Sequence, residues 1–225
     1  MNIFRRKFYT AICLFLILIS CVFASSCAKT SELEKFILEL RCNLYYGECE
    51  SVKLNAHYGF DLNDNTSSTS PIYGLYFHLA NVDTDNVTRK VSYVENDKTH
   101  NAEFKLDPVT NKMTAFIEIA DFDKKEFTVL LIEGSTTHEI KLTSLPPENT
   151  LTYHKAMEIL ENTQKPLIDA YKNENGTFNA SIIMRVIVKN QKPYWYVGFK
   201  KADGNLKAFL LDGITGETLA IREVL

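Results

Sequence analysis

The sequence predicts an α+β protein: an N-terminal helix and an antiparallel β-sandwich, followed by a small module of one helix and an antiparallel sheet. Three observations predict this class. Apolar residues recur at helical spacing in residues 31–45, and short alternating segments separated by turn residues fill residues 51–145. Two β-hairpins are legible in residues 194–221, downstream of a second helical segment.

The predicted organisation has five parts. They are a lipoprotein signal peptide (residues 1–20), an anchor segment with a helix (21–50), the β-sandwich (51–145), a linker (146–151) and the C-terminal module (152–225). The linker is assigned from Pro146 and Pro147, because two prolines cannot continue a ladder of strand hydrogen bonds and they stiffen the joint.

The N-terminus has the features of an export signal. Arg5, Arg6 and Lys7 precede residues 8–24, in which no residue is charged and most are apolar. This stretch has about the length of a secretory apolar region with its flank, and it is short for a membrane span of roughly 20 residues. We therefore expect a leader.

Two cysteines at the end of the leader lie in contexts that resemble the lipobox of bacterial lipoproteins. Cys21 follows Leu18-Ile19-Ser20 and Cys27 follows Ala24-Ser25-Ser26. The resemblance implies a diacylglyceryl group on one thiol, with Cys21 the stronger match because leucine occupies the third position before it.

Such an anchor predicts a protein on the cell membrane that faces outside the cytoplasm. Several acyl chains, at about 0.8 kcal/mol per buried methylene, would hold it there firmly. Cleavage after Ala24 by an ordinary signal peptidase, which would secrete the protein, is the alternative, as is retention of an uncleaved anchor.

The chain that follows the leader is acidic. The leader contains three positive charges and no negative ones, so its removal changes the formal net charge from -3 to -6. No basic stripe compensates, which argues against nucleic acid as a partner and against electrostatic adhesion to anionic lipid.

Cys42 and Cys49 are the two cysteines beyond the leader. In an exported protein, a pair seven residues apart predicts a disulfide that closes a short loop, with a stabilisation of about 2 to 3 kcal/mol. A metal site is the alternative, but no second pair or nearby histidine completes four ligands. We therefore predict no metal and no cofactor.

The first helix is expected over residues 31–45. Leu33, Ile37, Leu40 and Leu44 recur at spacings of three and four, and Ser31 begins a capping box with the glutamate three residues on. A helix lying on the membrane surface is the alternative, although the glutamates on its polar side disfavour it.

Seven short strands at near-regular spacing follow, as in a β-sandwich of immunoglobulin-like outline. The strands are expected at residues 52–58, 72–80, 87–94, 101–106, 112–119, 126–132 and 137–142.

The C-terminal module begins with a helix for which Thr152 is the expected N-cap. Pro166 either kinks this helix or starts a second short one. A strand at residues 180–188 leads into the two hairpins, whose turns fall at residues 202–205 and 212–216.

This module resembles the PepSY domain of bacterial exported proteins. The resemblance covers about residues 152–221 and rests on the helix-then-strands order, on Tyr196-Val197-Gly198-Phe199, and on an Asp-x-x-Thr-Gly-Glu turn that starts at Asp212. Pro166 and a long loop before the first strand depart from the family. The resemblance implies a module found beside peptidases and in surface lipoproteins, with a role in inhibiting or binding peptidases and without catalytic residues.

Four residues form the candidate binding surface. Strand alternation places Tyr194 and Tyr196 on the face opposite Trp195, where they could bind a peptide or glycan or pack on the sandwich. Asp212 and Thr215 lie in the terminal turn. We prefer a structural role for them, because an aspartate at a turn start accepts backbone N–H bonds.

No catalytic motif is present. Five histidines are scattered without a His-x-x-x-His or Glu-x-x-His pair, and no Gly-x-Ser-x-Gly elbow occurs. The acidic turns at residues 61–65 and 121–123 could offer oxygen ligands to calcium, but the first lacks the glycine and glutamate of an EF-hand loop.

We therefore expect a non-catalytic lipoprotein that acts as a binding module outside the cytoplasm. Its expected partners are the membrane, through the lipid anchor, and a secreted or envelope peptidase or another envelope protein. An envelope hydrolase with an unrecognised site and a structural surface protein are the alternatives.

Overall fold

A computed structural model describes residues 31–50, 52–62, 70–80, 87–107 and 111–224. Glu32–Leu225 forms one compact unit. The leader with Cys21 and Cys27 lies outside the described residues, as does most of the acidic turn at 61–65.

Strands account for 58% and helices for 11% of the described residues. The elements in chain order are η1 (Glu34–Phe36), β1 (Ile37–Cys49), β2 (Val52–Asp61), β3 (Gly74–Ala80), β4 (Arg89–Glu95), β5 (Lys98–Glu103), β6 (Lys105–Asp107), β7 (Lys112–Glu118), β8 (Glu126–Glu133), β9 (Thr136–Ser144), α2 (Tyr153–Thr163), α3 (Lys165–Asp169), β10 (Ser181–Lys189), β11 (Lys192–Lys200), β12 (Leu206–Asp212) and β13 (Thr218–Val224). The predicted α+β class is therefore wrong, because this part of the chain is mostly antiparallel β-sheet. None of the described helices has the length and apolar character needed to cross a membrane.

The helix expected over residues 31–45 is not formed. A single 3-10 turn precedes β1, a strand of 13 residues that pairs with β2, β9 and β10. The helical spacing has another origin: a β-bulge between Arg41 and Asn43 shifts the strand's phase, so that Leu40 and Tyr45, five residues apart, are both buried. Pairing with three strands outweighs the local helix propensity.

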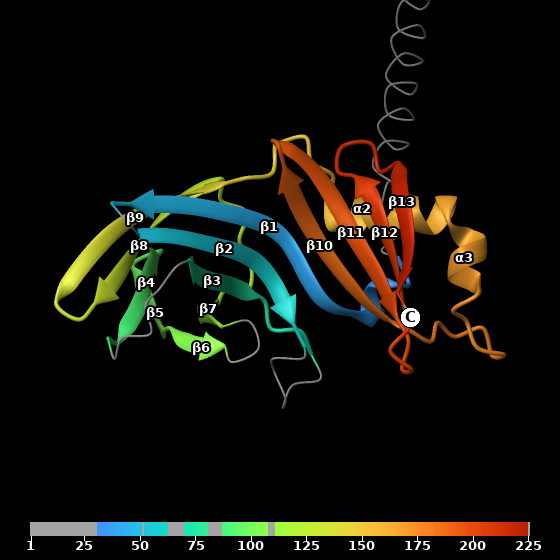
Figure 1. Cartoon of the computed structure of the whole chain (residues 1–225), viewed down its shortest axis with the longest axis horizontal. Helices are drawn as coiled ribbons and strands as arrows, with labels where there is room; N and C mark the ends of the chain where they lie inside the picture. Colours follow the sequence, from blue (N-terminus) through green and yellow to red (C-terminus); the bar gives the residue numbers. More distant parts are fainter. Residues whose placement is uncertain (1–30, 51, 63–69, 81–86, 108–110, 225) are drawn as a thin grey trace, which may run out of the picture. The chain divides into compact units, whose positions relative to one another are not determined.

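The predicted sandwich is also a correction, since all the strands belong to one sheet. The main path runs β13-β12-β11-β10-β1-β2-β3-β7-β6, and β9 joins it through Tyr45 and Tyr46 of β1. Figure 1 shows β1 extending from the β8–β9 hairpin to β10. It therefore belongs both to the N-terminal half of the sheet, which contains β2 to β9, and to the C-terminal half, which contains β10 to β13. Six of the seven strands expected within residues 51–145 form, with bounds that differ by a few residues, whereas the strand expected at 101–106 is divided into the end of β5, which pairs with β4, and β6, which pairs with β7.

Two apolar cores stabilise the unit. The first lies where β1, β2, β3 and β7 meet β4, β8 and β9, and it includes Phe77, Leu131 and Ile140. The second lies between the β10–β12 sheet and α2 and includes Leu40, Met184 and Trp195. Leu40 comes from β1, so the N-terminal strand contributes to the core of the C-terminal half.

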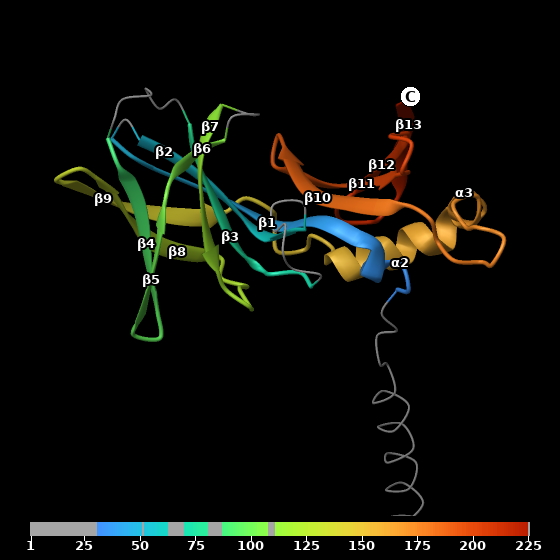
Figure 2. The same ribbon diagram turned by 90° about the horizontal axis from the view of Figure 1, so that it is seen from below.

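The predicted N-cap, second short helix and two hairpins of the C-terminal segment are confirmed. Thr152 caps α2 by accepting the N–H of Lys155, and Pro166 lies at the start of the short second helix α3. Trp195 is 1% exposed and donates its Nε1–H to the Leu151 carbonyl at 3.0 Å. Figure 2 shows α2 and α3 together on one side of the β10–β13 strands.

Gly216 fixes the last turn against the helix. Its φ of +77° is unfavourable for other residues, and a Cβ there would lie 2.6 Å from the Ile159 Cδ1 of α2. Gly204 has a similar φ of +91° but no heavy atom within 4 Å. Substitutions at the two glycines therefore distinguish the cost of a positive φ from the cost of the contact with Ile159.

We predict that Gly216→Ala lowers the free energy of unfolding by about 2 kcal/mol and Gly204→Ala by about 1 kcal/mol. Both variants incur the positive-φ cost, but only the first also displaces Ile159. Urea unfolding followed by the fluorescence of Trp195, the single tryptophan, measures both values. Equal losses would show that the contact with α2 contributes nothing.

Candidate functional site

The sheet presents one long face that no described helix or strand layer covers, called here the open face. In each strand, side chains that alternate with the core residues point to it. Its central members are Phe116 of β7, Tyr76 of β3, His57 of β2, Glu39 and Arg41 of β1, Arg185 of β10, Tyr196 of β11 and Leu210 of β12. Figure 2 shows α2 and α3 on the opposite side.

Two arginines share one glutamate at the centre of the open face. The Nε of Arg41 donates to Glu39 Oε1 at 2.6 Å. Arg185 binds the same carboxylate with two groups, through Nε at 2.7 Å and Nη2 at 2.5 Å. Fork-shaped guanidinium contacts of this kind are among the stronger hydrogen bonds in proteins. We call Arg41, Glu39 and Arg185 the arginine cluster.

The register of two parallel strands assembles the arginine cluster. Arg41 of β1 lies opposite Arg185 of β10, and Glu39 lies opposite Ile183. Glu39 is 5% exposed, and burying its charge is compensated only because two cations hydrogen-bond it. The hydrogen bonds from Arg185 to Glu39 raise the pKa of Arg185 further above its ordinary value.

A stack of rings continues the open face into the N-terminal half. His57 lies parallel to Tyr76, with ring centroids 4.8 Å apart, and its other neighbour is His78 at 5.1 Å. His57 Nδ1 and His78 Nε2 are 3.2 Å apart, so one ring donates a hydrogen bond to the other. Phe116 extends the stack beyond Tyr76, at 4.6 Å.

Both histidines of the stack are neutral at neutral pH. Burial lowers the pKa of His57 well below 6.5, and the nearby charge of Arg41 adds to this effect. Burial and Arg41 lower the pKa of His78 to about 4, with Lys112 adding to the effect and Asp107 opposing it. The open face thus combines the arginines with a stack of uncharged rings, of which His57 and Tyr76 are largely buried.

The predicted tyrosines lie on this face. Tyr196 pairs with Arg185 on one side and Leu210 on the other, and Tyr194 pairs with Ile187 and Asp212. The Tyr196 ring lies along the sheet, because its hydroxyl would be 3.1 Å from a Cβ added at Gly198. A larger residue at 198 would lift the ring off the strand.

Asp212 and Thr215 stabilise the terminal turn. Asp212 Oδ1 accepts the N–H groups of Ile214 and Thr215, at 2.9 and 2.8 Å, and these bonds lower the pKa of Asp212. Thr215 Oγ1 accepts the N–H of Glu217 at 3.3 Å. These contacts account for both residues structurally, as the sequence suggested.

The expected disulfide between Cys42 and Cys49 is not formed. Both cysteines belong to β1, where seven residues at about 3.3 Å each separate their Cα atoms by roughly 20 Å, far beyond disulfide reach. Both thiols are free. Cys42 Sγ donates to the Tyr58 carbonyl at 3.3 Å, and burial raises the pKa of Cys42 to about 12.

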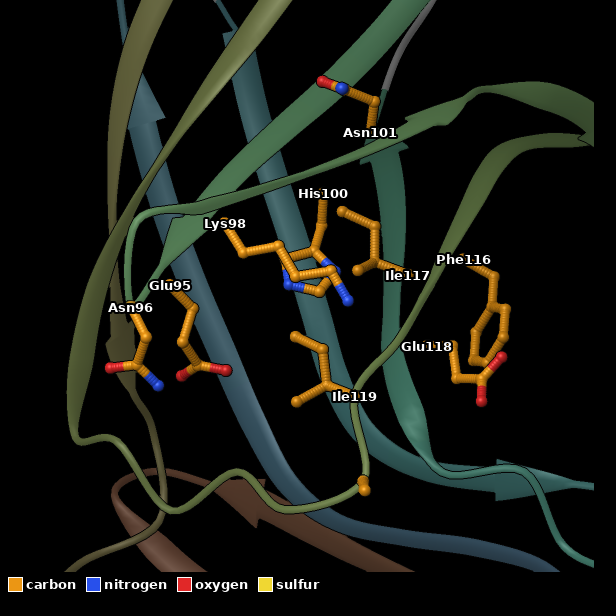
Figure 3. Close-up of a pocket in the computed structure, with 10 residues that line it drawn as sticks. Glu95, Asn96, Lys98, His100, Asn101, Phe116, Ile117, Glu118 and Ile119 are labelled. Atoms are coloured by element: carbon orange, nitrogen blue, oxygen red, sulfur yellow. The ribbon is translucent and has the colours of Figure 1, made fainter.

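A separate hollow of about 670 Å³ lies between the β4–β5 hairpin and β7. Figure 3 shows Ile117 and Ile119 turned toward His100 across it. Both isoleucines belong to the first core, and Glu95 at its rim is paired with Lys124 at 3.1 Å. We interpret this hollow as the junction between a hairpin and a core strand.

A second hollow of about 760 Å³ adjoins the linker and includes the acidic turn at Asp121 and Asp123. In the part of the chain that the structure describes, no three residues among His, Cys, Asp and Glu are grouped to hold a metal ion. The calcium interpretation of this turn therefore gains no support.

Two further histidines lie close to glutamates. His154 Nδ1 lies 2.8 Å from Glu34 Oε2, and His138 Nε2 lies 3.4 Å from Glu133 Oε2. Within the described ranges, no histidine hydrogen-bonds a serine, threonine or cysteine.

Sequence reasoning did not find the arginine cluster or the ring stack. Their members come from strands that are distant in the sequence, so no local motif unites them. A weak signal did exist: Glu39 and Arg41 alternate with leucines, and Arg185 lies between Met184 and Val186. Charged residues inside apolar strands are candidates for a paired site.

Comparisons with protein families, with curated proteins and with solved structures find no match for this chain.

The histidine pair predicts that stability falls as pH falls. Below about pH 6.5 the unfolded chain binds protons at these histidines, whereas the folded pair stays neutral down to about pH 4. We expect the free energy of unfolding to drop by about 4 kcal/mol more between pH 7 and pH 5 in the native protein than in a His57→Gln/His78→Gln variant, because each histidine contributes about 2 kcal/mol.

Chemical unfolding at a series of pH values tests this, with His100→Gln as a control that keeps the pair. A double variant with the native pH dependence would show that the two rings titrate normally.

Proposed function

We propose that the protein is a non-catalytic binding module, held on the outer side of the cell membrane by an N-terminal lipid, and that it binds a partner protein through the open face. The arginine cluster is the observation that carries this proposal. It places two partly accessible guanidinium groups between Tyr196 of β11 and the largely buried ring stack of β2 and β3. Charged groups and aromatic rings gathered in this way are typical of protein interfaces, where arginine and tyrosine are enriched.

The rigidity of the open face supports the same function. Its side chains come from paired strands rather than from loops, and Glu39 holds both arginines in place. A preformed surface binds with less loss of conformational entropy than a mobile one.

The proposed location at the membrane rests on the leader. Its length, its charged start and the lipobox-like context of Cys21 support export and lipid attachment. The resemblance of residues 152–221 to PepSY domains supports a secreted or envelope peptidase as the partner.

Mass spectrometry of the membrane-extracted protein tests the proposed lipid attachment. We predict an N-terminal peptide that begins at Cys21 and carries a diacylglyceryl group. Cys21→Ser should then shift the protein from the membrane to the soluble fraction, whereas Cys27→Ser should leave it in the membrane. An intact leader with unmodified thiols would contradict the proposal, and acylation at Cys27 would reassign the anchor.

Site-specific photo-crosslinking tests the binding surface. A photoreactive residue in place of Tyr196 should capture a partner in intact cells, and the same residue in place of Lys165 on α3 should not. The captured protein is then identified and purified, and its affinity for the native chain is measured. We expect Tyr196→Ala to weaken that affinity at least about tenfold, as for an aromatic contact residue.

Equal capture from both positions would contradict the proposal, as would a purified pair that does not bind. If the partner is a peptidase, its activity measured with and without this protein shows whether binding inhibits it.

A further inference from the structure

We infer that the arginine cluster binds a carboxylate of the partner, and that the segment bound on the open face is an extended acidic peptide. This inference rests on the proposed function and names the chemistry of the ligand.

The first argument concerns unused hydrogen-bond donors. Arg41 uses only its Nε toward Glu39, so its two terminal amino groups have no acceptor among the described residues. Arg185 uses Nε and Nη2, which leaves Nη1. The side chains of Arg41 and Arg185 are 34% and 38% exposed, against 6% for Glu39, so a ligand can reach the arginines while the glutamate stays covered.

The second argument concerns charge. One buried carboxylate faces two guanidinium groups, and Asp61, the other acidic residue nearby, lies opposite Glu39 on the side of the cluster away from Tyr194. Toward Tyr194 the same face continues to Ile187 and the β10–β11 turn, whose ends are Lys189 and Lys192. This side of the cluster is therefore positive.

One acidic side chain lies beside Tyr194 on this face, and it is hydrogen-bonded within its own turn. Asp212 lies opposite Tyr194, but its Oδ1 accepts two backbone N–H groups of its own turn. Its Oδ1 is therefore engaged within the turn, and among the described residues no hydrogen bond joins Asp212 to Arg41 or Arg185.

The third argument concerns geometry. A guanidinium group presents a planar fork of N–H donors that matches the two oxygens of a carboxylate. The neighbouring surfaces are flat and apolar: Tyr196 lies along the strand over Gly198, with Leu210 beside it. An extended peptide can place an acidic side chain on the arginines and its next but one residue on Tyr196, because its side chains also alternate.

Glu39 makes the site ready for its ligand. Because both arginines are already ordered by one carboxylate, a ligand does not have to order two long side chains, and less conformational entropy is lost on binding.

The test is an array of random nine-residue peptides probed with the full chain in detergent. We expect the bound peptides to be enriched in Asp and Glu at least about threefold over the array. Arg41→Gln and Arg185→Gln should abolish the enrichment, and Arg41→Lys, which keeps the charge but not the fork, should reduce it. Lys165→Gln removes one positive charge from α3, on the opposite side of the sheet, and should leave the enrichment unchanged.

Thermal unfolding of each variant shows whether it is folded. Arg185 holds Glu39 with two groups and Arg41 with one, so Arg41→Gln is the milder change. It therefore still tests the inference if Arg185→Gln unfolds the chain. Peptide binding without a preference for Asp and Glu would overturn this inference and leave the proposed function standing. Binding to phosphatidylglycerol vesicles in place of peptides would also overturn it, in favour of a lipid phosphate. Binding to neither probe would overturn it and would count against the proposed function as well.

Discussion

The pairing of β1 with β10 is the constraint on which the rest of the structure depends. Residues 37–41 of β1 hydrogen-bond to β10 in parallel on one side and to β2 in antiparallel fashion on the other. Parallel strands need a long connection, and here it comprises the whole of β2 to β9 together with α2 and α3. Without this pairing the two halves would be joined through the linker and a few side chains, and Leu40 would have no core to enter.

The same pairing creates the polar site and sets its cost. A strand in the middle of a sheet must expose one of its two faces unless another layer covers it. On β1 that face bears Glu39 and Arg41, and β10 brings Arg185 beside them. Removing either type of partner would leave a buried charge without compensation, which is far costlier than the net gain that the ion pair provides. The histidine pair avoids the cost of a buried charge in another way, because both rings stay neutral.

The sequence predicted best where local rules decide the structure. The α2 cap at Thr152, the short helix at Pro166 and the turns of the last hairpins all depend on neighbouring residues. It failed at residues 31–45, where spacings of three and four arise from a 3-10 turn and a β-bulge, and only contacts with distant strands reveal them. The disulfide was wrong for a related reason: it assumed a short loop between Cys42 and Cys49, whereas these residues continue β1 into a join with β9. The sandwich was wrong because regular strand spacing does not show which strands pair, and here all of them belong to one sheet.

The candidate site was half visible in the sequence for the same reason. Tyr194 and Tyr196 could be placed on a face because alternation within one strand is a local property. Which residues flank them depends on register between strands, and the parallel register of β1 against β10 has no signature in either segment alone. The strand that joins the halves therefore also brings together a surface that neither half would have by itself: tyrosines from the C-terminal meander, rings from β2 and β3, and a glutamate with two arginines at the join. A partner that contacts this surface interacts with both halves at once, so its binding would stabilise the join itself by mass action.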